Sequence, residues 1–190
     1  MGHKAEQTKR HLAATLAAML EDLPLGKVSV SELVRRAGTN RQTFYYHFRS
    51  IDDLAVYLFS SRLALVSHEV ARCRNAHELF SVVLDRVAAD KDILAQILRG
   101  VGRPPLRAFF YCDVQAILRE QAERMLADAV RDGAAAPKQR ALDFALEYCQ
   151  MASVSLVIDW LEGSLVLDSA CLADRLACSF EQQIKGLLAA

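Results

Sequence analysis

The sequence predicts an all-α protein with two parts, an N-terminal helix-turn-helix domain and a longer helical domain behind it. Apolar residues recur at intervals of three and four along almost the whole chain, which is the spacing of helices with one buried side. The sequence has no run of strict apolar and polar alternation, bounded by turn residues, of the kind that forms a β-hairpin. Pro and Gly interrupt the apolar pattern and divide the chain into about nine helices.

The two short helices of the expected helix-turn-helix have clear start and stop signals. Ser29 and Glu32 form the S-x-x-E pattern of a capping box, and the helix that they begin ends near Gly38. Asn40 can cap the next helix, over residues 41–48. We expect the other helices up to residue 23, directly after residue 50, and near 76–89, 91–99, 105–131, 138–163 and 169–188.

This pattern suggests a division of the chain into a helix-turn-helix domain over residues 1–50, a connecting helix over 51–74 and a longer helical domain over 75–190. The helix near 138–163 is apolar on nearly all sides, and the last helix, near 169–188, offers a second apolar face. A helix of that kind must be buried on nearly all sides. We therefore expect these two helices to pair with the same helices of a second copy, as a four-helix interface of a homodimer.

Charge is distributed unevenly along the chain. The formal net charge is zero, but residues 1–49 hold eight Lys or Arg against four Asp or Glu, a surplus of four positive charges. The rest of the chain carries the balancing acidic excess. A protein that meets a polyanion with one end only is expected to have this distribution.

Several classes of function find no support in the sequence. There is no nucleophile-base constellation and no Gly-rich phosphate loop, so we expect no enzyme, no catalytic residue and no cofactor. His68, Cys73 and His77 lack the local spacing of a zinc site, and we expect no metal. No apolar stretch of signal-peptide type is present, and the longest apolar segment, 151–161, is too short to span a bilayer. We expect a cytoplasmic protein with no membrane partner.

The helix expected after Asn40 has the composition of a recognition helix. Phe44 and Phe48 can anchor its buried side, while its other side offers hydrogen-bond donors and aromatic rings to bases and phosphates. An alanine-glycine pair precedes the turn, and the helix continues as Tyr45-Tyr46-His47-Phe48, then a basic residue and an acidic-Leu pair. This order resembles the TetR family of transcription regulators. The resemblance covers roughly residues 8–58. Within the family, this region is most similar to the regulators related to the dihydroxyacetone kinase activator.

The resemblance implies a TetR-like fold and a set of DNA-binding residues. These are Ser29, Asn40, Arg41, Gln42, Thr43, Tyr45, Tyr46, His47 and Arg49. Arg41, Gln42 and Tyr46 are candidates for base contacts, and Ser29, Thr43, Tyr45, His47 and Arg49 for phosphate contacts. Gln42 stands where Gly or Ala is common in the family, and its amide can read adenine. The resemblance also implies a palindromic operator, bound by a dimer whose affinity an effector in the second domain controls; most relatives repress, and the similar subgroup includes an activator.

Two questions stay open at this stage. The aromatic residues Phe109, Tyr111, Phe144, Tyr148 and Trp160 could line an effector pocket, but core packing explains the same residue types. The effector could be a small molecule or a protein partner. Alternatively, the helix-turn-helix could have lost DNA binding, and the chain could be a protein interaction module. Salt-dependent binding to duplex DNA distinguishes a DNA-binding regulator from such a module.

Overall fold

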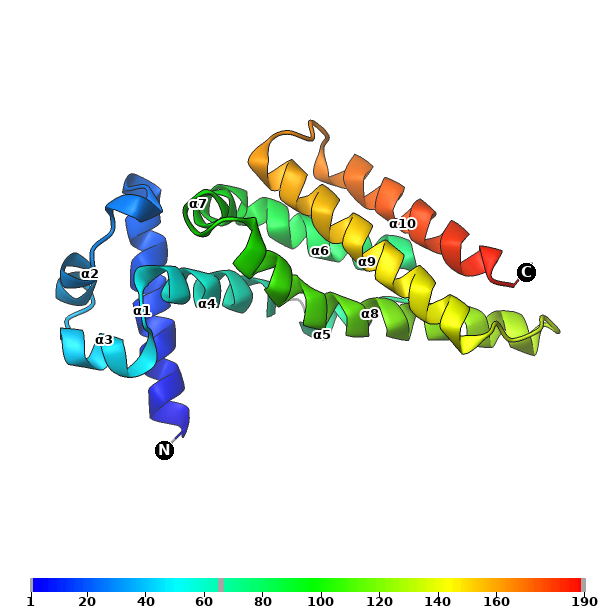
Figure 1. Cartoon of the computed structure of the whole chain (residues 1–190), viewed down its shortest axis with the longest axis horizontal. Coiled ribbons are helices and arrows are strands. Elements are labelled where there is room, and N and C mark those ends of the chain that lie inside the picture. Colours follow the sequence, from blue (N-terminus) through cyan, green and yellow to red (C-terminus); the bar gives the residue numbers. More distant parts are fainter. Residues whose placement is uncertain (1, 65–66, 189–190) are drawn as a thin grey trace. The chain divides into compact units, whose positions relative to one another are not determined.

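The computed structural model describes residues 2–64 and 67–188, except for the side chains of residues 2–3, 63–64, 67–68 and 105–113. All regular secondary structure in this part of the chain is helical (Figure 1), which confirms the predicted all-α class. The chain divides into two compact units, one formed by residues 1–65 and 90–106 and the other by residues 66–89 and 107–190.

The N-terminal unit is built around one long helix, α1. Its elements are α1 (Gly2–Asp22), the 3-10 turn η1 (Leu25–Lys27), α2 (Val30–Arg36), α3 (Arg41–His47), α4 (Ile51–Ala64) and α7 (Lys91–Val101). Leu12, Leu16 and Leu20 of α1 are fully buried, as the apolar stripe predicts, because α2, α3, α4 and α7 all pack against this helix. The core of the unit therefore lies along one side of α1.

The second unit is a bundle of longer helices. Its elements are α5 (Ser67–Val70), α6 (Ala76–Ala89), most of α8 (Arg103–Arg131), α9 (Gln139–Glu162) and α10 (Ser169–Gly186). Helix α10 packs against both α6 and α9, and the rings of Phe80 and Phe180 meet at 6.2 Å between α6 and α10. Arg119 of α8 and Asp143 of α9 form an ion pair of 2.7 Å. The helix limits agree with the sequence-based ranges to within two residues in this unit.

The division of the chain differs from the one suggested by the sequence. Helix α4, expected to be a connecting element, packs on α1 within the N-terminal unit, and so does α7, which was expected in the regulatory domain. The expected break over residues 100–105 is shorter in the structure. Helix α7 runs to Val101 and α8 begins at Arg103, because a proline is tolerated in the first turn of a helix and Gly102, at φ +85°, makes the bend alone.

Helix α9 is long and apolar enough to span a membrane by length and composition, the one such helix among the described residues. The sequence analysis predicts no membrane span, because the longest apolar segment, 151–161, is too short to cross a bilayer. One side of α9 is buried in the bundle, including Leu146, Ile158 and Trp160. A core helix of a bundle has the same apolar composition, so length and hydropathy do not by themselves indicate a membrane span.

Candidate nucleic-acid interface

Helix α2 begins at Ser29, as the sequence predicts, but only half of the predicted capping box forms. The Ser29 side-chain oxygen accepts a hydrogen bond of 3.2 Å from the backbone N–H of Glu32. The Glu32 carboxylate does not return to Ser29. It accepts instead from Arg35 at 2.6 Å and from Arg36 at 2.9 Å. Both arginines lie one turn further along α2, and two charged donors outcompete one neutral backbone N–H for the carboxylate.

The arginine pair controls the acidity of Glu32. Hydrogen bonds from Arg35 and then from Arg36 lower the pKa of the Glu32 carboxyl to about 2. The Glu32 carboxyl is therefore ionised at neutral pH. Glu32, Arg35 and Arg36 form a solvent-exposed cluster on α2, in line with the usual position of paired charges on a helix surface.

A tight turn places α3 after α2. Gly38 adopts φ +61° in this turn, a left-handed conformation that glycine reaches without steric cost. Asn40 then caps α3, because its side-chain oxygen accepts from the backbone N–H of Thr43 at 2.8 Å. The Thr43 hydroxyl donates to the same oxygen at 3.1 Å. The hydroxyl predicted to contact phosphate is thus already bonded to the cap.

Helix α3 is anchored by two phenylalanines. Phe44 is completely buried and Phe48, which ends the helix, is nearly so; their rings lie 6.0 Å apart. The chain then turns into α4 through a second cap, in which Ser50 accepts from Asp53 N–H at 3.2 Å and the Asp53 carboxylate accepts from the Arg49 N–H at 3.0 Å. Caps at both ends and a buried side hold α3 in a fixed orientation.

The orientation of α3 decides which side chains point outward. Successive helical residues are about 100° apart around the axis, so residues 42 and 46 lie opposite the midpoint between Phe44 and Phe48. Tyr46 is 81% exposed, the most exposed aromatic side chain among the described residues, and Gln42 is also exposed. These two side chains form the centre of the outward surface of α3.

The remaining predicted DNA-binding residues of this region flank that centre. On one side Arg41 lies over the ring of Tyr45, with 5.9 Å between the guanidinium carbon and the ring centroid. On the other side the half-buried His47 meets the edge of Tyr46 at 4.9 Å between ring centroids. Arg49 is exposed just beyond the end of α3. The predicted residues of α3 other than the buried Phe44 and Phe48 therefore lie around its outward surface, with Arg49 just beyond them, whereas Ser29 stands at the start of α2.

Sequence reasoning did not single out a cluster beside the C-terminal end of α3. Tyr57 of α4 donates a hydrogen bond of 2.8 Å to Glu6 of α1, and its ring lies 5.4 Å from that of Phe48. The Lys9 ammonium nitrogen lies over the same Tyr57 ring, 5.9 Å from its centroid. Desolvation, and then the bond to Glu6, raise the pKa of Tyr57. The only sign of this cluster in the sequence is the close spacing of the charged residues Glu6, Lys9 and Arg10 in α1.

The predicted effector residues do not form one group. Trp160 is buried in the core of the second unit, where its indole N–H donates to the Leu167 carbonyl at 2.8 Å. Phe144 and Tyr148 are instead 73% and 54% exposed on α9. The side chains of Phe109 and Tyr111 lie outside the described residues. Core packing accounts for Trp160, whereas Phe144 and Tyr148 lie on the surface of α9.

This geometry agrees with a comparison to known families. Residues 13–58, which contain α2, α3 and both caps, match the family described as bacterial regulatory proteins, tetR family. Residues 13–58 are therefore similar to the N-terminal domain of TetR-family regulators. The TetR family consists of transcription regulators and not of enzymes. No curated protein sequence matches the chain.

Solved structures show that the TetR-like fold extends over the whole chain. The dihydroxyacetone kinase operon activator DhaS is 16% identical, with a TM-score of 0.69, and the match covers 95% of this chain and 98% of that one. A tetR-family transcriptional regulator from Streptomyces coelicolor is 17% identical, with a TM-score of 0.63, over 100% of this chain and 84% of that one. The fatty acid degradation regulator FadR from Bacillus halodurans is 15% identical, with a TM-score of 0.56, over 97% and 96%. At these identities the likeness concerns the fold.

Proposed function

We propose that this TetR-family regulator binds a palindromic operator as a homodimer, with α3 in the major groove of each half-site. The observation that carries the proposal is the outward surface of α3, where Gln42 and Tyr46 project from a helix that Phe44 and Phe48 hold in place. A glutamine amide can form two hydrogen bonds with adenine, and an aromatic ring can contact the methyl group of thymine. Arg41 at the start of α3 is a further candidate for a base contact, and Arg49 just beyond its end is a candidate for a phosphate contact.

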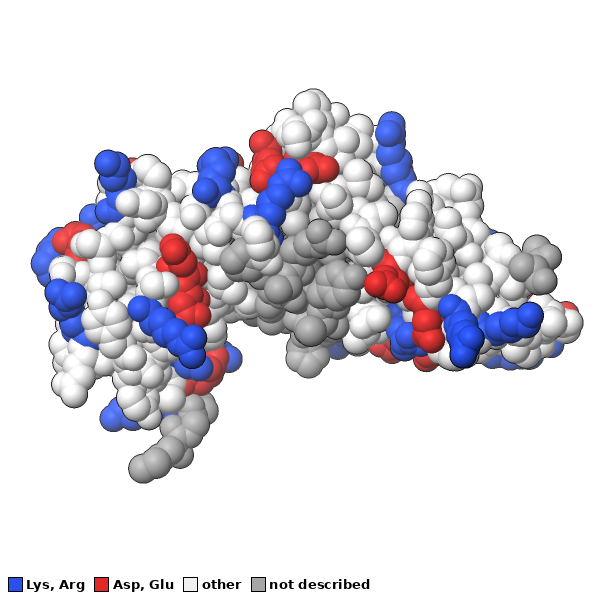
Figure 2. Space-filling model, viewed as in Figure 1, with Lys and Arg blue, Asp and Glu red and all other residues white. Residues whose placement is uncertain are grey.

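The surface charge also supports DNA binding by the N-terminal unit. Figure 2 shows Lys and Arg side chains distributed over the visible surface of the N-terminal unit. The surplus of four positive charges in residues 1–49 lies in this unit. Phosphate contacts from such a surface add affinity without reading sequence, and they make binding depend strongly on salt.

Helix α9 supports the dimer. Its buried side faces the bundle, but Phe144, Tyr148 and Met151 form an apolar stripe on its other side that is open to solvent. Large apolar side chains that gather on one exposed face often mark a protein–protein interface. A second copy that covers the stripe also explains the membrane-like composition of α9, because the helix would then be buried on nearly all sides.

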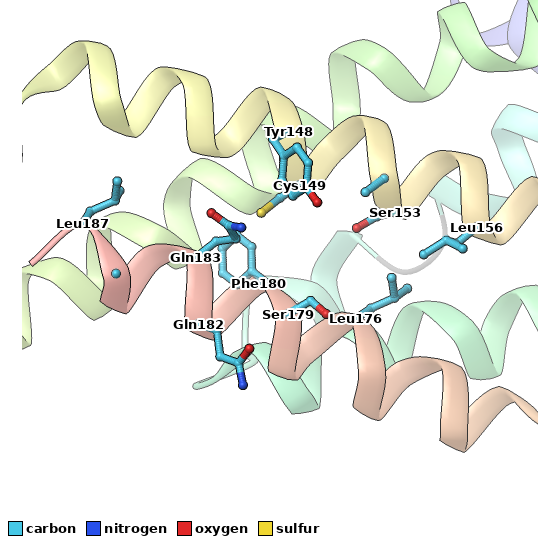
Figure 3. A pocket seen from close by; sticks show the side chains of 12 residues that line it. Tyr148, Cys149, Ser153, Leu156, Leu176, Ser179, Phe180, Gln182, Gln183 and Leu187 are labelled. Atoms are coloured by element: carbon cyan, nitrogen blue, oxygen red, sulfur yellow. The ribbon is translucent and has the colours of Figure 1, made fainter. Parts of the chain in front are cut away.

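A groove beside the stripe gives the second copy a surface to fit. It lies between α9 and α10 and has a volume of about 570 Å³. Figure 3 shows Tyr148 and Cys149 entering it from α9, and Ser179 and Phe180 from α10. Several lining residues are small, including Ala152, Ser153 and Gly186, so a large side chain could enter. In a two-fold interface each copy offers the same patch, so the patch must be complementary to itself. The exposed stripe of α9 and the groove beside it would meet this requirement.

We propose that the second unit carries the effector-controlled regulation. An effector, either a small molecule or a protein partner, would change the separation of the two α3 helices from the 34 to 36 Å or so that successive major grooves require. We propose repression as the default sign, since a bound dimer obstructs transcription. The protein would act in the cytoplasm, where bacterial operator DNA is located.

Selection of operators from a random duplex library tests this proposal. The purified protein should enrich a two-fold symmetric site whose half-sites lie about one helical turn apart. Enrichment of an asymmetric site would contradict the dimer, and no enrichment at all would contradict sequence-specific binding. A tagged second copy of the chain, retained together with the selected duplex, would provide independent support for the homodimer.

A further inference from the structure

A histidine of α1 contacts the turn that joins α2 to α3. The ring nitrogen Nε2 of His11 lies 2.9 Å from the carbonyl oxygen of Ala37, although 26 positions separate the two residues in the sequence. A carbonyl oxygen only accepts hydrogen bonds, so Nε2 carries the proton and donates. Nε2 is a donor in the neutral Nε2–H tautomer and in the protonated ring alike. The contact is therefore a directed bond from α1 to the turn.

The Ala37 carbonyl lies at the end of α2, where helix carbonyls have no partner within the helix. Ala37 is 8% exposed and directly precedes Gly38, the glycine of the turn. The carbonyls of residues 33–35 accept from backbone N–H groups of residues 37–39. In the part of the chain that the structure describes, the Ala37 carbonyl accepts from no backbone N–H, and the His11 ring supplies its donor.

Apolar packing also joins α1 to the two short helices. Figure 1 shows α2 and α3 against one side of α1, and Leu16 of α1 and Phe44 of α3 are fully buried. Burial of apolar surface is not directional, whereas a hydrogen bond has a preferred length and angle. Among the described residues, His11 makes the one side-chain hydrogen bond from α1 to residues 29–49. His11 therefore fixes the turn in a way that packing alone does not.

The turn leads directly into the recognition helix. Asn40 stands three residues after Ala37 and caps α3 through the N–H of Thr43. A shift of the Ala37 carbonyl is passed along this short link to the first turn of α3, from which Gln42 projects. We propose that His11 is a positioning residue for α3, which does not touch DNA itself but fixes the direction in which Gln42 meets the operator. The inference rests on the proposed binding of α3 to an operator.

Two substitutions separate the hydrogen bond from the ring. In His11→Gln the amide nitrogen is as many bonds from Cα as Nε2 and can donate to the same carbonyl. His11→Phe keeps a ring of similar shape and has no donor. Operator affinity should fall about fivefold in His11→Phe, the size expected for the loss of one hydrogen bond, and should be restored in His11→Gln. Affinities are measured well below the unfolding transition of each variant, because a loss of stability alone does not change the affinity of the folded protein.

Amide hydrogen exchange of the free protein gives a second readout that needs no DNA. The amides of Gly38 and Thr39 should exchange faster in His11→Phe than in the unchanged protein, because the turn opens more often, and His11→Gln should restore their protection. The amide of Leu58 in α4, which is remote from the turn in sequence and is buried, is the control and should not change.

Three results would overturn the inference. They are equal exchange at the turn in all three proteins, unchanged operator affinity in His11→Phe, and a His11→Gln variant that behaves like His11→Phe. If the unchanged protein binds no duplex, the proposed function fails, and the exchange rates still decide whether His11 fixes the turn. The failure of the inference and the failure of the proposed function are therefore distinguishable.

Discussion

Gly100 of α7 lies directly against the side chain of Leu25. A Cβ atom on Gly100 would stand 2.5 Å from Leu25 Cδ2 and 2.9 Å from Leu25 Cβ. One turn earlier, the Gln96 side-chain amide donates a hydrogen bond of 2.6 Å to the Leu20 carbonyl near the end of α1. This close approach of backbone to side chain attaches α7 to the N-terminal unit, and only glycine permits it at position 100.

Gly100→Ala should therefore destabilise the N-terminal unit. Overpacking typically costs about 1 to 3 kcal/mol, and the higher helix propensity of alanine offsets up to about 1 kcal/mol of that. Urea unfolding of Gly100→Ala, Leu25→Ala and the double variant measures the coupling between the two positions. We expect the double variant to be less destabilised than the sum of the single variants. Strict additivity would contradict the contact.

The elements of the helix-turn-helix could be predicted because local signals determine them. Ser29 and Asn40 cap α2 and α3 as expected, and Phe44 and Phe48 are buried as expected. These are interactions between residues close in sequence, so one sequence is enough to infer them. The outward position of Tyr46 follows in the same way from helix periodicity.

Relationships between distant residues could not be predicted in this way. The sequence pattern predicts a break between helices at Gly100, whereas the role of Gly100 depends on Leu25, which is far away in the sequence. The assignment of α7 to the N-terminal unit depends on the same contact. Trp160 and Phe144 have similar sequence surroundings, yet one is buried and the other exposed, because the packing of α10 decides which side of α9 is covered.

Substitutions on the outward surface of α3 should separate binding from stability. Tyr46→Ala and Gln42→Ala should both weaken operator binding, and Gln42→Ala should reduce discrimination at one base pair by about 1 to 3 kcal/mol. The free energy of unfolding should change by no more than about 0.5 kcal/mol, because both side chains are exposed. Titration of labelled operator, together with thermal unfolding, measures both quantities. Unchanged affinity in both variants would exclude α3 as the recognition helix.

The exposed stripe of α9 should control the oligomeric state. Phe144→Glu should shift the protein from dimer to monomer, since a charge would be placed in an apolar interface, and sedimentation velocity measures the change. Val166→Glu is the matched control. Val166 is 87% exposed but lies between α9 and α10, outside the stripe. A Phe144→Glu variant that remains dimeric would place the interface elsewhere.

Acid should weaken the cluster on α2. The pKa of Glu32 is lowered in the folded protein to about 2, from an ordinary value of 4.5. The stabilisation by this carboxylate is therefore fully present above pH 4.5 and is lost as the pH falls towards 2. Glu32→Gln should make the fall of Tm across this pH window shallower, while Glu21→Gln serves as a control for removing an exposed carboxylate of the same unit. Parallel Tm curves for Glu32→Gln and the unchanged protein would contradict the pairing.

Base should act on Cys149 in the opposite sense. Burial raises the pKa of this thiol from 9.0 to about 11. The unfolded chain ionises first, so the stability contributed by the buried neutral thiol is present below pH 9 and is lost as the pH rises towards 11. At pH 9, iodoacetamide should modify Cys149 slowly in the folded protein and rapidly in urea, as peptide mass spectrometry would detect. Equal rates in the two states would contradict the burial.

The most direct test of the central claim is the affinity of the purified protein for its selected operator and for a scrambled duplex of the same composition, across a series of salt concentrations. The account predicts binding to the operator that is tighter by roughly a thousandfold or more, with log affinity falling by about 0.9 per phosphate neutralised for each unit of log salt. Equal and salt-independent affinity for the two duplexes, or no binding to either, would contradict DNA recognition by α3 and would favour a protein interaction module.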